Sequence, residues 1–275
     1  MSKIQTLELS KKIEEEIKAS NKGCIIRPSV AVIQIGDNEL SNIHIKLKEE
    51  ACNRAGIYFR FFKFEEDTPE LTIVNKIKEI NNDDYVNGIM LELPIPEKYN
   101  EKRLINSILN TKDIDGLTDI NIGRLISGRK TFIPSTISAI MTILKENNVD
   151  LVGKDVVVLG KGKLVGRPLI FQLLNEGATV TICHSKTIDL TKYTKDADVI
   201  ISAIGVKHIV KPDMVKQDVV IIDAGYVIEE GRLYGDVDPK VESKASLFTP
   251  KTNCIGPLSI SMFLKNIMIS YNNKK

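Results

Sequence analysis

Three polar residues, Ser41, His44 and Lys48, stand three and four positions apart in the segment SNIHIKLK. In a helix, these spacings place all three side chains on one face. An imidazole and an ammonium group on one face could transfer protons and stabilise developing charge. An isolated pattern of this type is more often a solvated polar face, so its meaning depends on what the rest of the chain supplies.

Three further segments could complete a site around these groups. GIMLELPIP (88–96) is an apolar strand pattern that runs into a double-proline turn, and its only charge is Glu92. A carboxylate in such a strand is seldom buried without a partner. TKDIDGLTD (111–119) holds Asp115 in a tight acidic loop, and TPKTNCIGPLS (249–259) forms a proline-glycine loop before the last helical segment. Because loops at strand ends usually carry the site of an α/β protein, these segments are candidates for it.

A glycine-rich segment in the second half indicates a different chemistry. Gly160, Gly162 and Gly166 follow the apolar run VVVL and open a helical pattern. Glycines in this position let a phosphate group approach backbone N–H groups at the positive end of a helix. The spacing is one residue longer than the usual dinucleotide pattern, and a glycine-rich turn without a ligand is the alternative. The strand-helix-strand context favours nucleotide binding.

The next strand pattern bears on which nucleotide would bind. It ends in CHSKT (183–187), where an NAD site usually has a carboxylate for the ribose hydroxyls. Lys161, Ser185 and Lys186 are available instead. A hydroxyl and cations suit a 2′-phosphate, so the sequence favours NADP, with NAD also possible.

The candidate residues lie within a pattern of strand-like runs that alternate with helical ones along the chain. This alternation predicts a layered α/β fold. The expected strands are 30–35, 57–64, 88–93, 156–160, 179–183, 198–205 and 219–225. The expected helices are 39–55, 68–80, 135–148, 164–176 and the C-terminal segment, whose apolar positions form a buried face. We expect two lobes that join near 135–150, with a Rossmann-like parallel sheet in the second.

Composition excludes several protein classes. Apolar residues make up 43% of the 275 residues and charged residues 27%, which is typical of a globular protein. The net charge of +2 gives no electrostatic reason to expect nucleic acid as a partner. The first residues lack the apolar core of a signal peptide, and no apolar run is long enough to span a bilayer. The four cysteines are scattered without metal-ligand spacing, so we expect no metal and no membrane partner, and a cytoplasmic location.

Several blocks together resemble the bifunctional methylenetetrahydrofolate dehydrogenase/cyclohydrolases. SNIHIKLK is similar to the family's S-x-x-Y-x-x-x-K helix, GIMLELPIP to its G-I-L-V-Q-L-P-L-P strand, and KDIDGL to its K-D-V-D-G-F loop. LGKGKLVGRP resembles G-R-S-x-x-V-G-x-P, CHSKT matches directly, and TNCIGPLS stands in place of P-G-G-V-G-P-M-T. The blocks occur in the family's order and cover nearly the whole chain.

The resemblance implies oxidation of 5,10-methylenetetrahydrofolate with NADP and hydrolysis of the methenyl product to 10-formyltetrahydrofolate. It implies a homodimer, a catalytic folate-binding domain of residues 1–138 with 257–275, and a Rossmann-like domain of residues 139–256. The implied catalytic residues are Lys48, Glu92 and Asp115, with Lys48 handling protons and Asp115 holding the pterin ring. The implied substrate-binding residues are His44, Leu91, Leu93, Asn253, Cys254, Ile255 and Gly256. The implied dinucleotide-binding residues are Gly160, Lys161, Gly162, Gly166, Ser185, Gly205 and Tyr226.

The chain departs from the family pattern inside the expected site. His44 replaces a tyrosine, Glu92 replaces a glutamine, and Asn253 and Cys254 replace paired glycines. A carboxylate near Lys48 favours its charged form, so we expect the hydrolytic step to be weakened more than hydride transfer. On the nucleotide side Lys161 replaces an arginine, which reduces the expected preference for NADP because a lysine is a poorer partner for phosphate.

Two other readings remain open at this stage. The substitutions fit a relative that binds folate or nucleotide without turnover. The scaffold also fits a dehydrogenase for another small substrate. Retention of both Lys48 and Asp115 favours folate.

Overall fold

The computed structural model describes residues 6–249 and 255–273, which form two compact units. The three-strand unit comprises residues 9–124, 129–135 and 260–273. The five-strand unit comprises residues 6–8, 125–128, 136–249 and 255–259. The chain therefore passes between the units within helices α1 (Thr6–Asn21), α5 (Asp119–Ile126), α6 (Ser135–Glu146) and α9 (Ile255–Asn273), and again between residues 128 and 129.

The three-strand unit is built on a parallel sheet in the order β2-β1-β3. Its central strand β1 (Ser29–Ile35) is buried along its whole length, as expected for a parallel strand covered on both faces. The flanking strands are β2 (Tyr58–Phe64) at one edge and β3 (Gly88–Leu91) at the other. The helices of this unit are α2 (Glu39–Ala55), α3 (Glu70–Asn81), α4 (Glu101–Asn106) and α5 (Asp119–Ile126), together with most of α1 and α9.

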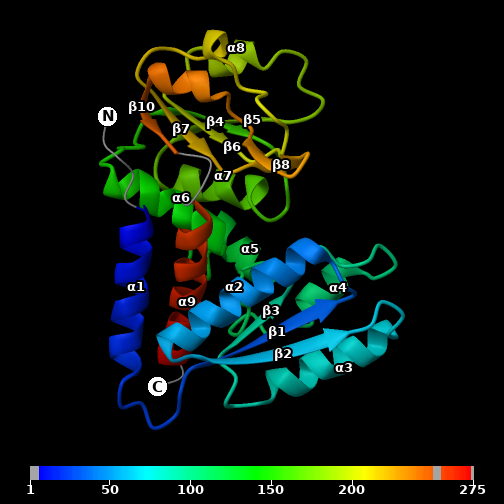
Figure 1. Cartoon of the computed structure of the whole chain (residues 1–275). Coiled ribbons are helices and arrows are strands. Elements are labelled where there is room, and N and C mark those ends of the chain that lie inside the picture. The colour runs from blue at the N-terminus through cyan, green and yellow to red at the C-terminus, as the bar shows by residue number, and fades with distance from the viewer. Residues whose placement is uncertain (1–5, 250–254, 274–275) are drawn as a thin grey trace. The chain divides into compact units, whose positions relative to one another are not determined.

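Helix α9 contributes a buried stripe to this unit, as its apolar spacing predicts. Phe263, Leu264 and Ile267 are almost fully buried. Helices α1 and α9 lie side by side (Figure 1), and the hydroxyls of Ser10 and Ser261 are 2.6 Å apart. The first and last helices of the chain therefore pack as one layer of this unit.

The five-strand unit contains a parallel sheet in the order β10-β7-β6-β4-β5 (Figure 1). The chain runs from β4 outward to the edge strand β5, then crosses to the central strand β6 on the other side of β4. This reversal of direction is a topological switch point, where ligands of open α/β sheets bind. The elements of the unit, besides α6, are β4 (Asp155–Leu159), α7 (Gly166–Asn175), β5 (Thr179–Cys183), α8 (Thr191–Thr194), β6 (Val199–Ser202), the 3₁₀ turns Pro212–Met214 and Pro239–Ser243, β7 (Val219–Asp223), β8 (Tyr226–Glu229), β9 (Arg232–Gly235) and β10 (Ala245–Phe248).

The sequence did not predict the strands that follow β7. Strands β8 and β9 form an antiparallel hairpin whose turn residues Glu230 and Gly231 both have positive φ, as a tight two-residue turn requires. The four-residue strand β10 completes the sheet beside β7. Helices α4, α5 and α8 were also missed, because four to eight residues carry too little periodicity to be recognised.

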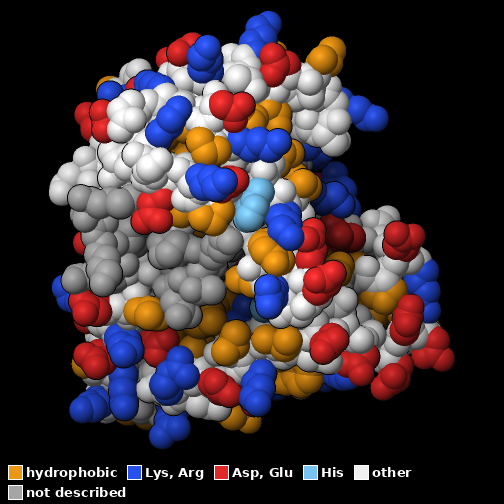
Figure 2. All heavy atoms as spheres, turned by 45° about the horizontal axis from the view of Figure 1, so that its top comes forward, with side chains coloured by type: hydrophobic (Ala, Val, Ile, Leu, Met, Phe, Trp, Pro, Cys, Tyr) orange, Lys and Arg blue, Asp and Glu red, His pale blue; other side chains and the backbone are white. Residues whose placement is uncertain are grey.

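The surface carries charges of both signs. Lysine and arginine side chains are interspersed with aspartate and glutamate on the face shown in Figure 2, in keeping with the net charge of +2. No helix among residues 6–249 and 255–273 combines the length and apolar character needed to cross a membrane.

Helix α2 has defined caps at both ends, which fix the face that carries His44 and Lys48. The Asn38 side chain accepts a hydrogen bond from the N–H of Ser41, and Gly56 ends the helix with a φ of 75°. We expect Gly56→Ala to lower the free energy of unfolding by about 1 kcal/mol, because a Cβ is disfavoured at this φ. The nearest atom to that Cβ, on Asn21, would be 3.8 Å away, so the backbone conformation alone causes the loss.

Gly123→Ala is the matched control for this prediction. Gly123 lies inside helix α5, and a Cβ there meets no atom within 4 Å. This change should raise the free energy of unfolding by up to about 1 kcal/mol, because alanine favours helix interiors. Chemical denaturation followed by circular dichroism measures the free energy of unfolding of both variants. Changes of the same sign in the two variants would contradict the explanation given for Gly56.

Candidate active site

A buried ion pair joins helix α2 to the end of strand β3. The Nζ atom of Lys48 lies 2.8 Å from Oε2 of Glu92. The Glu92 side chain is 4% exposed and the Lys48 side chain 19% exposed, so this pair is largely removed from water. The Lys48 ammonium also lies 5.8 Å from the centre of the Phe263 ring, a distance at which a cation is attracted to the ring face.

Local structure explains why these two residues meet. Lys48 lies on the same side of α2 as the buried residues Ser41, Ile45 and Cys52. The N–H of Glu92 donates to the carbonyl of Ile33, which extends the β1–β3 pairing by one residue beyond the strand. The Glu92 side chain is thereby fixed beneath the helix.

His44 completes this group on its solvent side. Its Nδ1 atom lies 3.8 Å from Oε1 of Glu92, and its side chain is 46% exposed. Burial alone raises the pKa of Glu92, but contacts with His44 and Lys48 outweigh it and leave that pKa below its ordinary value. Glu92 is therefore ionised at neutral pH and provides a fixed negative charge beside the Lys48 ammonium.

Asp115 differs from Glu92 because its carboxylate is desolvated without a hydrogen-bond donor among the described residues. Desolvation raises its pKa to about 7; the charge of Lys48 opposes the rise, and the charges of Asp113 and Glu92 add to it. The Asp115 carboxyl group therefore lies within the field of the Lys48–Glu92 pair. At neutral pH the Asp115 carboxyl group is therefore partly protonated, so it can either donate or accept a hydrogen bond.

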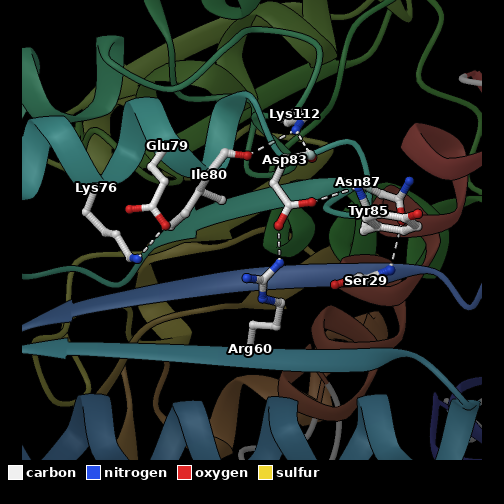
Figure 3. Close-up of polar contacts among 9 residues, drawn as sticks. All are labelled: Ser29, Arg60, Lys76, Glu79, Ile80, Asp83, Tyr85, Asn87 and Lys112. Atoms are coloured by element: carbon white, nitrogen blue, oxygen red, sulfur yellow. Dashed lines mark hydrogen bonds and ion pairs between the residues drawn. The ribbon is translucent and has the colours of Figure 1, made fainter.

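The loop that carries Asp115 is held at its start by a buried lysine. Lys112 is 3% exposed, and its Nζ donates to the carbonyls of Ile80 (3.1 Å), in the last turn of helix α3, and of Asp83 (2.7 Å), just after the helix. Figure 3 shows Lys112 directed at these two carbonyls, with the Asp83 carboxylate turned away to pair with Arg60 on β2. The loop is thus fixed to the last turn of α3.

Asp113 and Asn266 hold the remainder of the loop. The Asp113 carboxylate accepts hydrogen bonds from the N–H groups of Leu117 and Thr118 and from Nδ2 of Asn121. From helix α9, Nδ2 of Asn266 donates to the Ile114 carbonyl at 2.8 Å. The backbone on each side of Asp115 is therefore fixed, whereas its own carboxylate remains available.

The sequence did not single out Lys112, Asp113 or Asn266 for these positioning roles. Lys112 and Asp113 lie within the quoted acidic segment, but nothing in the sequence separates a loop-capping aspartate from a ligand-binding one. Asn266 is a polar residue next to the apolar stripe of helix α9, directly before Ile267, and this placement is the signal that could have identified it.

The other predicted substrate-binding residues lie in different surroundings. Leu91 is 4% exposed and packs in the core cluster of the three-strand unit, and Leu93 packs partly buried against the same cluster. Ile255 and Gly256 form the start of helix α9, in the part of it that belongs to the five-strand unit. Asn253 and Cys254 lie outside the described residues.

In the five-strand unit, the glycine loop joins β4 to helix α7. A Cβ on Gly160, whose φ is 111°, would lie 2.6 Å from the Ala203 carbonyl oxygen. A Cβ on Gly166 would lie 2.0 Å from the Gly160 carbonyl oxygen. A Cβ on Gly162 would meet nothing within 4 Å. The first and third glycines are therefore required by close backbone packing, whereas position 162 has room for a side chain.

The remaining predicted dinucleotide-binding residues gather at one edge of the sheet. Strands β4, β5, β6 and β7 are parallel, so their carboxyl ends meet at the same edge. Each strand is followed there by one of the predicted residues: Gly160, Ser185, Gly205 and Tyr226. Ser185 is exposed in a turn closed by hydrogen bonds between His184 and Thr187. A Cβ on Gly205 would lie 3.3 Å from the Tyr226 carbonyl oxygen.

This edge fits a dinucleotide. Lys161 and Lys186 are exposed near the glycine loop and in the β5 turn, and no carboxylate lies between His184 and Ile188. Helix α7 begins at Gly166, so its free N–H groups and positive dipole end follow the loop directly. Among the described residues, no three histidine, cysteine or acidic side chains are grouped so that they could hold a metal ion.

Comparison with known proteins also separates a catalytic domain from a dinucleotide-binding domain. Residues 4–115 match the family model "Tetrahydrofolate dehydrogenase/cyclohydrolase, catalytic domain", and residues 134–275 match the corresponding "NAD(P)-binding domain". The chain is 40% identical over 281 residues to the bifunctional protein FolD of Campylobacter hominis, an alignment that covers 100% of this chain and 98% of that protein.

Solved structures give the same result. The bifunctional FolD enzyme of Campylobacter jejuni superposes with a TM-score of 0.96 at 39% identity and covers 99% of both chains. The FolD enzyme of Trypanosoma brucei, solved with NADP and an inhibitor, has a TM-score of 0.93 at 28% identity and covers 99% of this chain and 98% of that one. The chain belongs to the tetrahydrofolate dehydrogenase/cyclohydrolase family.

Proposed function

We propose that the protein oxidises 5,10-methylenetetrahydrofolate with NADP and hydrolyses the resulting 5,10-methenyl cation to 10-formyltetrahydrofolate. The observation that carries this proposal is the buried Lys48–Glu92 pair with Asp115 in its field, in a chain of this family. NADP accepts the hydride. NADP is the expected cofactor because the β5 turn presents Ser185 and Lys186 and lacks a carboxylate.

The two half-reactions make different demands on the protein. In the first, a hydride leaves the methylene carbon and the folate gains a positive charge that is shared by two nitrogens. In the second, water adds to that carbon, the bond to one ring nitrogen breaks, and one proton is released. The first step needs orientation and fixed charge, whereas the second also needs groups that move protons.

The residues of the three-strand unit fit these demands. Lys48 would polarise the folate centre and transfer protons during hydrolysis, while Glu92 holds the lysine in place and keeps it charged. Asp115 would accept hydrogen bonds from the amino and ring N–H groups of the pterin, since a carboxylate matches an edge with two donors. His44, half-exposed beside Glu92, would contact the folate ring.

The residues of the five-strand unit would hold the dinucleotide. Gly160 and Gly166 keep the β4–α7 turn tight enough for phosphate oxygens to reach backbone N–H groups at the start of α7. Lys161, Ser185 and Lys186 would contact the phosphate groups or the ribose, and Gly205 and Tyr226 would line the same edge. Residues 1–138 with 257–275 and residues 139–256 remain our proposed division into catalytic and dinucleotide-binding domains.

The test is a spectrophotometric assay of the purified protein with methylenetetrahydrofolate and either NADP or NAD. Reduced nicotinamide should appear, faster with NADP, and added methenyltetrahydrofolate should lose its absorbance faster than in buffer. Absence of turnover with both cofactors would exclude the proposal. Assembly as a homodimer is proposed from the family resemblance, and light scattering would test it. A cytoplasmic location is proposed because the four cysteines are scattered, as in proteins that keep reduced thiols.

The Lys48–Glu92 pair predicts unequal rates for the two steps. Glu92→Gln should raise hydrolysis relative to hydride transfer by about tenfold, because the amide removes the negative charge that favours the protonated lysine. Both rates are measured in one preparation. Glu79→Gln is the matched control, because Glu79 also pairs with a lysine, Lys76 (Figure 3), at 2.8 Å, but its side chain is 68% exposed. An unchanged ratio in Glu92→Gln would contradict the prediction.

Asp115 predicts that substrate binding depends on pH. An ionised carboxylate accepts the pterin N–H groups, so tetrahydrofolate should bind about tenfold more tightly at pH 8 than at pH 6, given a pKa of about 7 in the free protein. Asp115→Asn should bind weakly and without this dependence in a titration calorimeter. If the dependence survives in Asp115→Asn, Asp115 is not its cause and the prediction is wrong.

The raised pKa of Asp115 also affects stability. Between pH 3.8, the ordinary pKa of an aspartate, and about 7, the folded chain binds more protons at this site than the unfolded chain. The contribution of Asp115 to the free energy of unfolding therefore decreases as pH rises through this window. Denaturation at pH 5 and pH 7.5 should show this decrease for the wild type relative to Asp115→Asn.

A further inference from the structure

The five-strand unit buries a carboxylate that the proposed chemistry does not use. Asp236, which follows β9, is fully buried. Its Oδ2 accepts hydrogen bonds from the Ser202 hydroxyl (2.6 Å) and the Ile204 N–H (2.8 Å). Its Oδ1 accepts from the N–H groups of Gly205 and Val206, both at 2.9 Å. Four donors from one segment, the end of β6 and the loop after it, thus converge on a single side chain.

A second buried aspartate holds the first in place. The Asp223 carboxylate accepts hydrogen bonds from the N–H groups of Asp236 (3.1 Å) and Val237 (3.0 Å). Glycines make this close approach feasible: a Cβ on Gly225 would lie 2.0 Å from Asp236 Oδ2, and a Cβ on Gly235 would lie 2.1 Å from Asp223 Oδ2. Each carboxylate occupies the space that a side chain on the other segment would need.

The segment that Asp236 holds lies at the edge where the dinucleotide is expected. Ala203 touches Gly160 so closely that a Cβ on Gly160 would lie 2.6 Å from its carbonyl. Gly205 has a φ of 76°, and its N–H is one of the three amides bound by Asp236. The conformation of this loop therefore depends on a carboxylate that lies outside the loop itself.

We propose that Asp236 is a positioning residue for dinucleotide binding, an inference that rests on the proposed function. Its charge fixes the loop of residues 203–206 against the glycine turn before the cofactor arrives. Because the carboxylate already occupies the three amides of that loop, they are not available to a phosphate group. The phosphate groups must then be bound by the turn that Gly160 and Gly166 form. The loop of residues 203–206 forms part of the wall of the site but donates no hydrogen bond to the phosphates.

Asp236→Asn tests this role with little change in volume. An asparagine has one acceptor oxygen, so its amide group would face at least one backbone N–H that has lost its acceptor. Asp238→Asn is the matched control: Asp238 lies two residues further along and accepts a hydrogen bond from the N–H of Lys240, not from the loop. We expect NADP to bind roughly 10- to 100-fold more weakly to Asp236→Asn and unchanged to Asp238→Asn, as measured by calorimetry.

Hydrolysis of methenyltetrahydrofolate separates positioning from general damage, because this step consumes no NADP. Its KM and kcat should be unchanged in Asp236→Asn, whereas the KM for NADP in the oxidation rises. Wild-type affinity for NADP in Asp236→Asn, or an equal loss in both reactions, would overturn the inference.

Hydrogen exchange in the cofactor-free wild type tests the same point without a variant. The amides of Ile204, Gly205 and Val206 should exchange slowly, as those of strand β6 do, although they lie in a loop. Exchange as fast as that of the exposed Ser185–Lys186 turn would overturn the inference, even if the variant does not fold. If neither wild type nor Asp238→Asn binds NADP, the proposed function fails, and the exchange rates still decide whether Asp236 holds the loop.

Discussion

The ion pair between Lys48 and Glu92 is the interaction on which the chemistry proposed for the three-strand unit depends. Two charges that are largely removed from water are stable only when they neutralise one another at close range. This requirement fixes helix α2 over the end of β3, because the 2.8 Å contact tolerates little displacement. Fixing the helix also fixes His44, one turn before Lys48. The same pair supplies both an ammonium group and the negative charge that limits its release of a proton.

The five-strand unit depends on a different constraint, namely how closely its backbone segments approach at the carboxyl edge of the sheet. Gly160, Gly166, Gly225 and Gly235 each lie where a Cβ would come within 2.0 to 2.6 Å of another atom. Two of these contacts are with backbone carbonyls and two with buried aspartates. Gly160 and Gly166 therefore keep the turn between β4 and α7 tight, whereas Gly225 and Gly235 leave room for the carboxylates of Asp236 and Asp223.

Much of the fold could be predicted because buried parallel strands have a distinctive sequence. All seven expected strands are present, with boundaries that differ by a few residues. Most are apolar β-branched runs between polar turns, and β2 is instead rich in phenylalanine. The glycine loop could be placed for the same reason. Helix α7 begins at Gly166 and not at residue 164, because the loop folds back on Gly160 before the helix opens.

What could not be predicted depends on contacts between segments that are distant in sequence. The short hairpin β8–β9 is followed directly by the buried Asp236. Nothing around Asp236 in the sequence indicates that its hydrogen-bond donors come from residues 202–206. Asp113 and Asp115 are two positions apart in one loop and have the same chemistry. Only the fold shows that the first caps the N–H groups of Leu117 and Thr118 while the second accepts no hydrogen bond from a described residue.

The acidic residues of the two units differ in whether the fold itself supplies partners for their carboxylates, and this difference distinguishes a structural carboxylate from a ligand-binding one. Asp113, Asp223 and Asp236 are buried, and each accepts at least two hydrogen bonds from backbone N–H groups, so the fold itself supplies their hydrogen-bond donors. For Asp223 these bonds only partly offset desolvation, which raises its pKa to about 6. Glu92 has its charge balanced by Lys48. Asp115 alone among these five accepts no hydrogen bond from a described residue that could offset its desolvation. A carboxylate that the fold leaves in this condition lowers its free energy by binding a ligand that donates hydrogen bonds, so the same desolvation that raises its pKa also supplies the driving force for recognition.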